Sequence, residues 1–329
     1  MLSDATGSRS RGAEEPSSGG LGGQRVLITG ASGQLGQFLL PAVSDLGATA
    51  IALGRQPGAG IDVAADLADR EETLRALGDV TPDVIIHAAA CTDVDGIERD
   101  PARGEASNAR ATRNIVEAAR EVGAYLVAVS TDMVFPGDGG APYEEDAPTS
   151  PISEYGRSKL AAERAVLEGD PAFAVARTAW LYGGAGKHFP RTVLAVLRDR
   201  GHIDVVDDEF GGPTFAADLA LALAQLAAAR GSGIFHLVNE GRASRFALAR
   251  HMATLAGFDP EQVRPVSTAA FLEQYPLPAR RPPDSTLHNR RAAALGITLR
   301  GWREALEAYA PVLAAEMRAR AVAAPVGGG

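Results

Sequence analysis

Short apolar runs alternate with segments of helical periodicity through the first half of the chain. The apolar runs predict buried strands at residues 25–29, 48–53, 61–63, 83–87, 124–130 and 173–178. Apolar positions at helical spacing predict helices at residues 37–46, 69–77, 101–122 and 153–167, the last beginning at a capping serine. This alternation predicts βαβ units, and therefore an α/β fold with a doubly wound parallel sheet of the Rossmann type.

The second half of the chain is less regular and predicts a smaller lobe. Helical spacing recurs at residues 189–200, 215–229 and 244–255, with a strand at 234–238. We therefore expect a disordered tail at residues 1–24, a dinucleotide-binding domain at 25–180, and a mainly substrate-binding lobe at 181–329 from which some elements return to the main sheet. Residues 131–152 are rich in proline and glycine, which predicts an ordered loop or a lid.

Composition and charge exclude several classes of protein. The 329-residue chain has a formal net charge of −9 and no basic run, which argues against nucleic acid or a membrane surface as a partner. Its one cysteine, Cys91, excludes an internal disulfide and suits a cytoplasmic protein. No apolar run reaches the ~18–20 residues of a membrane span, and the first 24 residues lack the apolar region of a secretory signal. The six histidines lack zinc-ligand spacing, so we expect no metal.

A glycine-rich turn follows the first predicted strand and opens the first helix. Its sequence, Gly30-Ala31-Ser32-Gly33-Gln34-Leu35-Gly36, has the spacing G-x-x-G-x-x-G. Such glycines permit the tight turn, the approach of backbone to a pyrophosphate, and close packing of helix on strand. The helix N-terminus then presents free N–H groups to the phosphates. The motif predicts a dinucleotide site, although a plain glycine-rich turn is the alternative in a chain with 37 glycines.

The residues after the second strand favour NADP(H) over NAD(H). Dinucleotide sites for NAD usually carry a carboxylate there, whereas this chain has Arg55, which can meet a 2′-phosphate. Use of NADH stays open, because Arg55 can equally be a solvated loop charge. Asp66 and Leu67 are candidates for the adenine edge. Ala88, Ala89 and Ala90 have side chains small enough for a cofactor to lie against the backbone.

A second pattern has the chemistry of a carbonyl reductase. Tyr155 and Lys159 have the spacing Y-x-x-x-K on a predicted helix, which places them on one face. There the ammonium is expected to lower the Tyr155 pKa, so that the phenol can give its proton to a carbonyl oxygen as hydride reaches the carbon. Thr131 directly follows the fifth predicted strand, at the edge where ligands of such sheets bind, and can share that oxygen. The alternative is a solvent-facing pair.

Longer segments make a family resemblance specific. The chain resembles the extended short-chain dehydrogenases, and within them the dTDP-4-dehydrorhamnose reductase family. The similarity spans most of residues 25–310, in the segments ITGASGQLG (28–36), AAACTDVDGIERDP (88–101), STDMVFPG (130–137), PYEEDAPTSPISEYGRSKLAAE (142–163), RTAWLYGGAGKHF (177–189), FGGPT (210–214) and ARRPPDSTL (279–287).

The resemblance implies roles for individual residues. Tyr155 would be the general acid, Lys159 would hold the nicotinamide ribose and tune the tyrosine, and Thr131 would orient the C4 carbonyl of the substrate. The implied substrate contacts are Thr92, Asp132, Val134, Trp180, Arg280 and Arg281. Core packing is the alternative for the tryptophan, and solvated surface charge is the alternative for the two arginines. His87, at the end of an apolar strand, is expected to be a hydrogen-bonded core residue.

Three positions depart from the family pattern and leave the sugar open. Met133 stands where members usually have an aromatic residue, and Asp208-Glu209 stands where they have Asp-Gln. Phe38 occupies the position of a glutamate that helps some members bind Mg²⁺ at a dimer contact. We therefore carry over neither the metal nor that dimer, and leave a homodimer of another kind open.

The resemblance implies NADPH-dependent reduction of the C4 keto group of a dTDP-linked 4-keto-6-deoxysugar. Reductases of this kind also serve antibiotic biosynthesis. Two alternatives remain: a nucleotide-sugar epimerase or dehydratase of the same superfamily, and a non-catalytic subunit resembling the regulatory subunit of methionine adenosyltransferase. The absence of a carboxylate near Arg55 argues against the first, and the intact Thr131, Tyr155 and Lys159 argue against the second.

Overall fold

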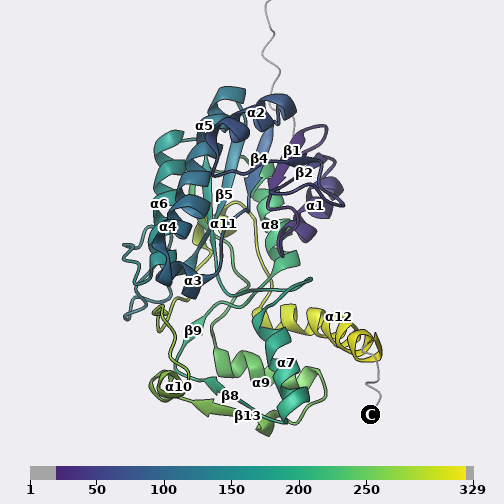
Figure 1. Ribbon diagram of the computed structural model, residues 1–329, viewed down its shortest axis with the longest axis vertical. Helices are drawn as coiled ribbons and strands as arrows, with labels where there is room; N and C mark the ends of the chain where they lie inside the picture. The colour runs from purple at the N-terminus through teal and green to yellow at the C-terminus, as the bar shows by residue number, and fades with distance from the viewer. Residues whose placement is uncertain (1–19, 324–329) are drawn as a thin grey trace, which may run out of the picture.

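The central sheet confirms the predicted doubly wound architecture. In the computed structural model, which describes residues 20–323, seven parallel strands lie in the order β11-β6-β5-β4-β1-β2-β3 (Figure 1). The order reverses between β1 and β4, so their carboxyl ends flank the crevice in which such sheets bind ligands. The strands are β1 Arg25–Thr29, β2 Thr49–Gly54, β3 Val63–Ala64, β4 Val84–His87, β5 Tyr125–Thr131, β6 Ala174–Thr178 and β11 Gly233–His236.

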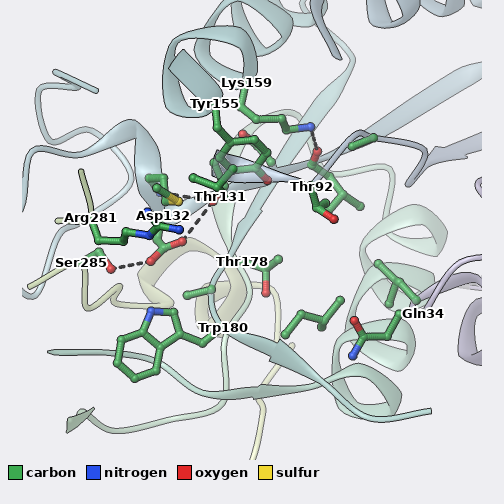
Figure 2. A pocket seen from close by; sticks show the side chains of 18 of the residues that line it. Gln34, Thr92, Thr131, Asp132, Tyr155, Lys159, Thr178, Trp180, Arg281 and Ser285 are labelled. Atoms are coloured by element: carbon green, nitrogen blue, oxygen red, sulfur yellow. Dashed lines mark hydrogen bonds between the residues drawn. The ribbon is translucent and has the colours of Figure 1, made fainter. Parts of the chain in front are cut away.

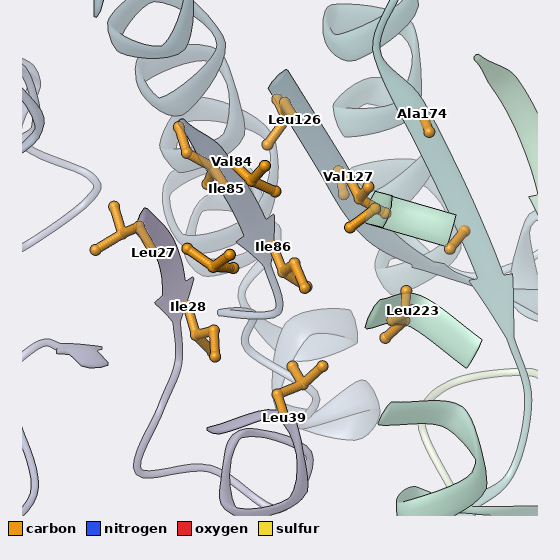
Figure 3. Packing of buried hydrophobic residues seen from close by; sticks show 14 of the residues in the cluster. Leu27, Ile28, Leu39, Val84, Ile85, Ile86, Leu126, Val127, Ala174 and Leu223 are labelled. Atoms are coloured by element: carbon orange, nitrogen blue, oxygen red, sulfur yellow. The ribbon is translucent and has the colours of Figure 1, made fainter. Parts of the chain in front are cut away.

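Helices cover both faces of this sheet. Helices α1 (Gly36–Asp45) and α8 (Ala216–Ala228) pack together on one face, and α2 (Arg70–Val80), α5 (Ala111–Val122) and α6 (Glu154–Gly169) pack in sequence on the other (Figure 1). Strand side chains fill the space between the layers, together with Leu39 of α1 and Leu223 of α8 (Figure 3). Each fully buried side chain of this size stabilises the fold by about 1.5–3 kcal/mol.

The helix expected at residues 101–122 is broken into pieces. A short helix α3 (Val94–Arg99) precedes α4 (Pro101–Gly104), and a π-helical turn η1 (Glu105–Arg110) separates α4 from α5. The side chain of Asn108 in this turn holds the backbone of Cys91, whose N–H donates to Oδ1 at 2.8 Å and whose carbonyl accepts from Nδ2 at 3.2 Å. Such bulges frequently mark functional sites, and this one anchors the loop that follows β4.

The ordered domain begins before the predicted end of the tail. Residues 1–19 of the expected tail lie outside the described residues. Within the remainder, Leu21 is fully buried in the core and the N–H of Gly23 donates to the carbonyl of Gly47 at 3.0 Å. Placing the tail boundary at residue 24 was therefore wrong, because a single leucine in a glycine-rich segment gives no periodic signal.

The lobe beyond the sheet has an apolar cluster of its own, which includes Tyr182, Met252 and Tyr309. Helix α8 and strand β11 come from the second half of the chain but belong to the main sheet layers. The other elements of the second half are β7 Leu181–Tyr182, α7 Phe189–Arg200, β8 Ile203–Val206, β9 Phe210–Gly211, β10 Thr214–Phe215, β12 Ala243–Ser244, α9 Arg245–Leu255, η3 Pro260–Gln262, β13 Val263–Val266, α10 Thr268–Gln274, α11 Arg290–Ala294 and α12 Trp302–Ala323. Over residues 20–323, no helix combines the length and apolarity that crossing a bilayer requires.

The proline- and glycine-rich segment after β5 is an ordered loop. It starts as a 3₁₀ turn, η2 (Asp132–Val134), and then folds back so that Tyr143 stacks on Phe135 with ring centroids 4.2 Å apart. The Tyr143 N–H donates to the carbonyl of Thr286 at 2.8 Å, which ties the loop to the C-terminal half. Glu145 is buried, and its carboxylate accepts the N–H of Arg291 at 2.8 Å.

Candidate active site

The glycine turn after β1 has room for backbone only. Gly30 has a φ of +69°, and a Cβ built there would lie 2.8 Å from the Cα of Ala89. A Cβ at Gly36 would lie 2.4 Å from the carbonyl oxygen of Ala31, so helix α1 can start here only with glycine. Gly33, between them, is exposed. The turn therefore leaves an open surface of backbone at the sheet's crevice, as a pyrophosphate requires.

A cavity of about 800 Å³ lies over this turn and the ends of β2 and β4. Sequence-predicted cofactor residues line it: Gly30, Ser32, Gly33, Arg55, Asp66, Leu67, Ala88, Ala89 and Ala90. A second arginine, Arg110 of η1, lines it as well. No motif identified this residue, because only the broken helix turns it toward the crevice. Two guanidinium groups and a glycine cradle fit a dinucleotide that carries an additional phosphate.

A buried hydrogen-bond chain fixes the backbone at the end of β4. The Thr112 hydroxyl donates to the Asn108 carbonyl at 2.6 Å and lies 3.1 Å from His87 Nε2. On the other side, the Thr29 hydroxyl lies 2.7 Å from His87 Nδ1 and accepts the N–H of Ala89 at 3.1 Å. Burial, and secondarily the charge of Lys159, lowers the pKa of His87 to about 3, so the imidazole is neutral. His87 is thus the hydrogen-bonded core residue that the sequence predicted.

The residues of the predicted catalytic trio meet around a second cavity of about 460 Å³. Thr131 lies at the end of β5, and Tyr155 and Lys159 extend from α6 toward it (Figure 2). The Lys159 ammonium donates to the carbonyl of Val129 at 2.8 Å. A Cβ at Gly156 would lie 2.3 Å from the carbonyl oxygen of Met133, so this glycine lets α6 pack directly on the turn that follows β5.

Burial dominates the electrostatics of the pair on α6. It raises the pKa of Tyr155 well above the usual value near 10; the Asp132 charge adds to this and the Thr131 hydroxyl opposes it. Burial also lowers the pKa of Lys159 to about 8, against the opposing charge of Glu163. The sequence predicted that Lys159 lowers the Tyr155 pKa, whereas in this structure burial and the Asp132 charge raise that pKa. The phenol keeps its proton at neutral pH.

Several predicted substrate contacts also line this second cavity. Thr92, Asp132, Trp180 and Arg281 do so, as do Gln34 and Leu35, which were predicted to bind the cofactor. Trp180 lies across the cavity from Tyr155 and Lys159 (Figure 2). Val134 does not: it is fully buried in a small apolar cluster behind the site. This prediction was wrong because the 3₁₀ turn η2 directs Met133 into the cavity and the next side chain into the core. Arg280 is exposed and borders a neighbouring cavity.

Asp132 is the carboxyl group most perturbed by the site. It accepts hydrogen bonds from the hydroxyls of Thr131, at 3.0 Å, and Ser285 (Figure 2). Burial raises its pKa to about 6, with these two hydrogen bonds opposing the rise. Ser285 comes from a segment more than a hundred residues away along the chain, and no local spacing could have revealed it.

Trp180 is held in an uncommon backbone conformation. Its φ is +43°, in a region that few residues other than glycine adopt. Its ring packs on Gly211, where a Cβ would lie 2.5 Å from the indole, and the guanidinium of Arg245 stacks on it at 3.6 Å from the ring centroid. Arg245 and its partner Glu209 both line the cavity, and neither was predicted from the sequence.

Phe38, which replaces a metal-binding glutamate of some relatives, lies outside the site. Its ring meets Phe215 edge to face with centroids 5.8 Å apart. Among the described residues, no group of three or more His, Cys, Asp or Glu side chains is arranged to hold a metal ion.

A parallel sheet with a dinucleotide turn, and Thr, Tyr and Lys around an adjoining cavity, defines an extended short-chain dehydrogenase/reductase. The family described as the RmlD substrate binding domain matches residues 24–314. The chain therefore belongs to the dTDP-4-dehydrorhamnose reductase family, as the sequence segments predicted.

Individual relatives cover nearly the whole chain. A dTDP-4-dehydrorhamnose reductase of Mycobacterium tuberculosis is 45% identical over 86% of this chain and 91% of its own length. A probable dTDP-4,6-dihydroxy-2-methyloxan-3-one 4-ketoreductase of Streptomyces antibioticus is 42% identical over 89% of this chain and 97% of its own. The crystal structure of dTDP-4-dehydrorhamnose reductase from Bacillus anthracis in complex with NADP superposes with a TM-score of 0.80 at 33% identity, over 87% of this chain and 98% of that one.

Proposed function

We propose that this protein uses NADPH to reduce the C4 keto group of a dTDP-4-keto-6-deoxysugar. One observation carries the proposal: the cavity that holds Thr131, Tyr155 and Lys159 opens into the cavity over the glycine turn, with Gly30 and Ala88 among the residues that line both. A cofactor lying in one cavity therefore reaches the catalytic side chains in the other. The relatives, which are named as reductases of dTDP-linked sugars, support the same substrate class.

The trio performs the proton-transfer half of the reaction. When bound, the nicotinamide supplies the hydride to the substrate carbon. The Tyr155 phenol donates its proton to the carbonyl oxygen, and its raised pKa keeps that proton in place until the oxygen becomes strongly basic. The Lys159 ammonium, with a pKa of about 8, is largely protonated at neutral pH and favours the phenolate that remains. The Thr131 hydroxyl orients the carbonyl oxygen.

The remaining predicted residues bind cofactor and sugar. The turn from Gly30 to Gly36 would hold the pyrophosphate, and Arg55, now joined by Arg110, would hold a 2′-phosphate. Asp132 and Trp180 border the space left for the sugar. Which sugar fits stays open, because the names of the relatives above differ in the sugar. The identity of the sugar would decide whether the protein serves rhamnose biosynthesis or antibiotic-sugar biosynthesis. We propose that it acts in the cytoplasm.

The alternatives receive no support from the site. An epimerase or dehydratase is expected to retain NAD through a carboxylate at the end of β2, where this chain has Arg55. A purely regulatory subunit has no need of a buried tyrosine and lysine beside the crevice. A homodimer stays a prediction.

NADPH oxidation, followed against a panel of dTDP-4-keto-6-deoxysugars, tests the proposal. We expect turnover of at least one sugar by the wild-type protein. Tyr155→Phe should lower kcat by about 10²–10⁴-fold, since it removes a general acid, while NADPH affinity stays within about twofold. Absence of turnover with every sugar, or full activity in Tyr155→Phe, would contradict the proposal.

A further inference from the structure

A third cavity, which we call the side cavity, adjoins the cavity that holds Thr131, Tyr155 and Lys159, which we call the catalytic cavity. No sequence motif predicted the side cavity. It has a volume of about 660 Å³, and residues of α7, β8 and α10 line it. These elements belong to the lobe (Figure 1). Three residues line both cavities and therefore mark their junction: Glu209, Arg245 and Arg281. A ligand that extends from the catalytic cavity into the lobe has to pass these side chains.

This side cavity is lined by both apolar and charged residues. The apolar residues include Phe271, Leu272, Tyr275 and Leu277, and the last three are among the exposed large hydrophobic residues of the chain. Among the charged residues, four arginines accompany two carboxylates: Arg200, Arg245, Arg280, Arg281, Asp204 and Glu209. In a chain with a net charge of −9, this local excess of positive charge favours an anionic ligand with a flat apolar part.

The two arginines at the junction differ in the donors that they leave available. Arg281 is bound at both ends of its fork, because both terminal nitrogens lie 2.7 Å from the carboxylate oxygens of Asp95. Arg245 is held differently. Its Nε donates to Glu209 at 2.9 Å, and its plane stacks on Trp180 at 3.6 Å from the ring centroid. Among the described residues, the two terminal nitrogens of Arg245 donate no hydrogen bond.

We propose that Arg245 binds the diphosphate of the substrate at the junction of the two cavities. Its free fork matches the oxygens of a phosphate, and Glu209 and Trp180 are positioning residues that hold the guanidinium in place. The sugar then lies in the catalytic cavity, and the nucleoside lies against the apolar residues of the side cavity. This inference rests on the proposed function, because it takes a nucleoside diphosphate sugar as the substrate. It assigns the diphosphate to Arg245, which the resemblance did not imply, rather than to Arg280 or Arg281, which it named as substrate contacts.

Calorimetric titration of the full-length protein with thymidine diphosphate tests the assignment. Arg245→Gln should weaken binding of thymidine diphosphate at least tenfold, and Arg245→Lys, which keeps the charge but not the fork, should weaken it less. With the sugar substrate, Arg245→Gln should raise KM and leave kcat within about threefold, because the Arg245 side chain hydrogen-bonds Glu209 and not Thr131, Tyr155 or Lys159. NADPH affinity should stay within twofold in both variants.

The chain offers a matched control three residues earlier. Arg242 stacks on Phe210 at 3.6 Å from the ring centroid and pairs with Asp284, yet it lines neither cavity. Arg242→Gln should leave the affinity for thymidine diphosphate within twofold. Equal weakening in Arg242→Gln and Arg245→Gln would overturn the assignment.

The remaining outcomes separate this inference from the function on which it rests. Wild-type affinity in Arg245→Gln would overturn the inference and leave the proposed function intact. If the wild-type protein neither binds thymidine diphosphate nor turns over any dTDP-sugar, both the inference about Arg245 and the proposed function are wrong. If Arg245→Gln also loses its affinity for NADPH, the fold of that variant is affected, and Arg245→Lys becomes the test. Undiminished affinity of Arg245→Lys for thymidine diphosphate would then overturn the role of the fork.

Discussion

Asp132 shows how one residue of the site can act against the stability of the fold. Its pKa is raised from 3.8 to about 6, mainly because the carboxyl is buried beside the cavity. Between those two pH values the folded protein binds more protons than the unfolded chain. The free energy of unfolding therefore falls as pH rises through this window, and the loss is complete above the folded-state pKa. A buried carboxylate that reduces stability is typical of functional sites.

Asp132→Asn should remove this pH dependence. From about pH 4 to pH 7, the stability of the variant relative to wild type should rise by roughly 2–3 kcal/mol, the linkage value of a shift of this size. Urea unfolding of both proteins at several pH values measures the difference directly. A difference that stays constant across that range would show that Asp132 has an ordinary pKa in the folded state.

At the scale of elements, the close packing of α6 on the turn after β5 brings Tyr155 to Thr131. The helix begins at a serine cap, where the Ser153 hydroxyl accepts the N–H of Gly156 at 3.1 Å. The same glycine meets the carbonyl of Met133. The Y-x-x-x-K spacing explains why Tyr155 and Lys159 share a face, but only this contact explains why that face reaches the end of β5.

Gly156→Ala should therefore damage both stability and catalysis. We expect a loss of about 1–3 kcal/mol, the usual range for overpacking, and a lower kcat because α6 has to move away from Thr131. Gly78→Ala is the matched control: Gly78 lies in α2, is exposed, and has nothing within 4 Å of a built Cβ. There the substitution should stabilise by about 0.5–1 kcal/mol. Equal effects of the two substitutions on unfolding and on kcat would contradict the role given to Gly156.

At two positions the local sequence pattern predicts the wrong structure. Gly78 was expected to end a helix that in fact runs to Val80, where Thr81 adopts the left-handed conformation of a C-cap. An exposed glycine inside a helix and a terminating one look alike in the sequence. Glu145 stands in a run of three acidic residues, a pattern that by itself predicts a solvent-facing loop, but the loop folds it against α11. The first error comes from an ambiguous local signal, whereas in the second a tertiary contact overrides local preference.

At the scale of the whole molecule, the site lies where the sheet domain meets the lobe. The cavity over the glycine turn is lined by residues at the ends of β1, β2 and β4 and by residues of η1. The side cavity is lined entirely by residues that follow β6. The catalytic cavity between them takes residues from both parts. NADPH and thymidine diphosphate should therefore order the backbone in different parts of the chain.

Hydrogen exchange measures this division. NADPH alone should slow exchange chiefly in residues 30–36, 53–56 and 88–92, and thymidine diphosphate alone should slow it chiefly in residues 268–281, because each ligand orders the backbone that it contacts. Protection of the glycine turn by thymidine diphosphate alone, to the same degree as by NADPH, would contradict the assignment of the cavities.

The sequence by itself determined the sheet architecture, the dinucleotide turn and the Tyr155–Lys159 pair, because each depends on periodicity or on spacing within one or two elements. Family segments extended this to the reductase family, and most of the residues predicted to bind the cofactor line the cavity over the glycine turn. The tertiary structure alone decided that Arg245 stacks on Trp180, that Ser285 reaches Asp132, and that burial raises the Tyr155 pKa. These features depend on segments far apart in the chain and on the exclusion of water, and neither leaves a local pattern in the sequence.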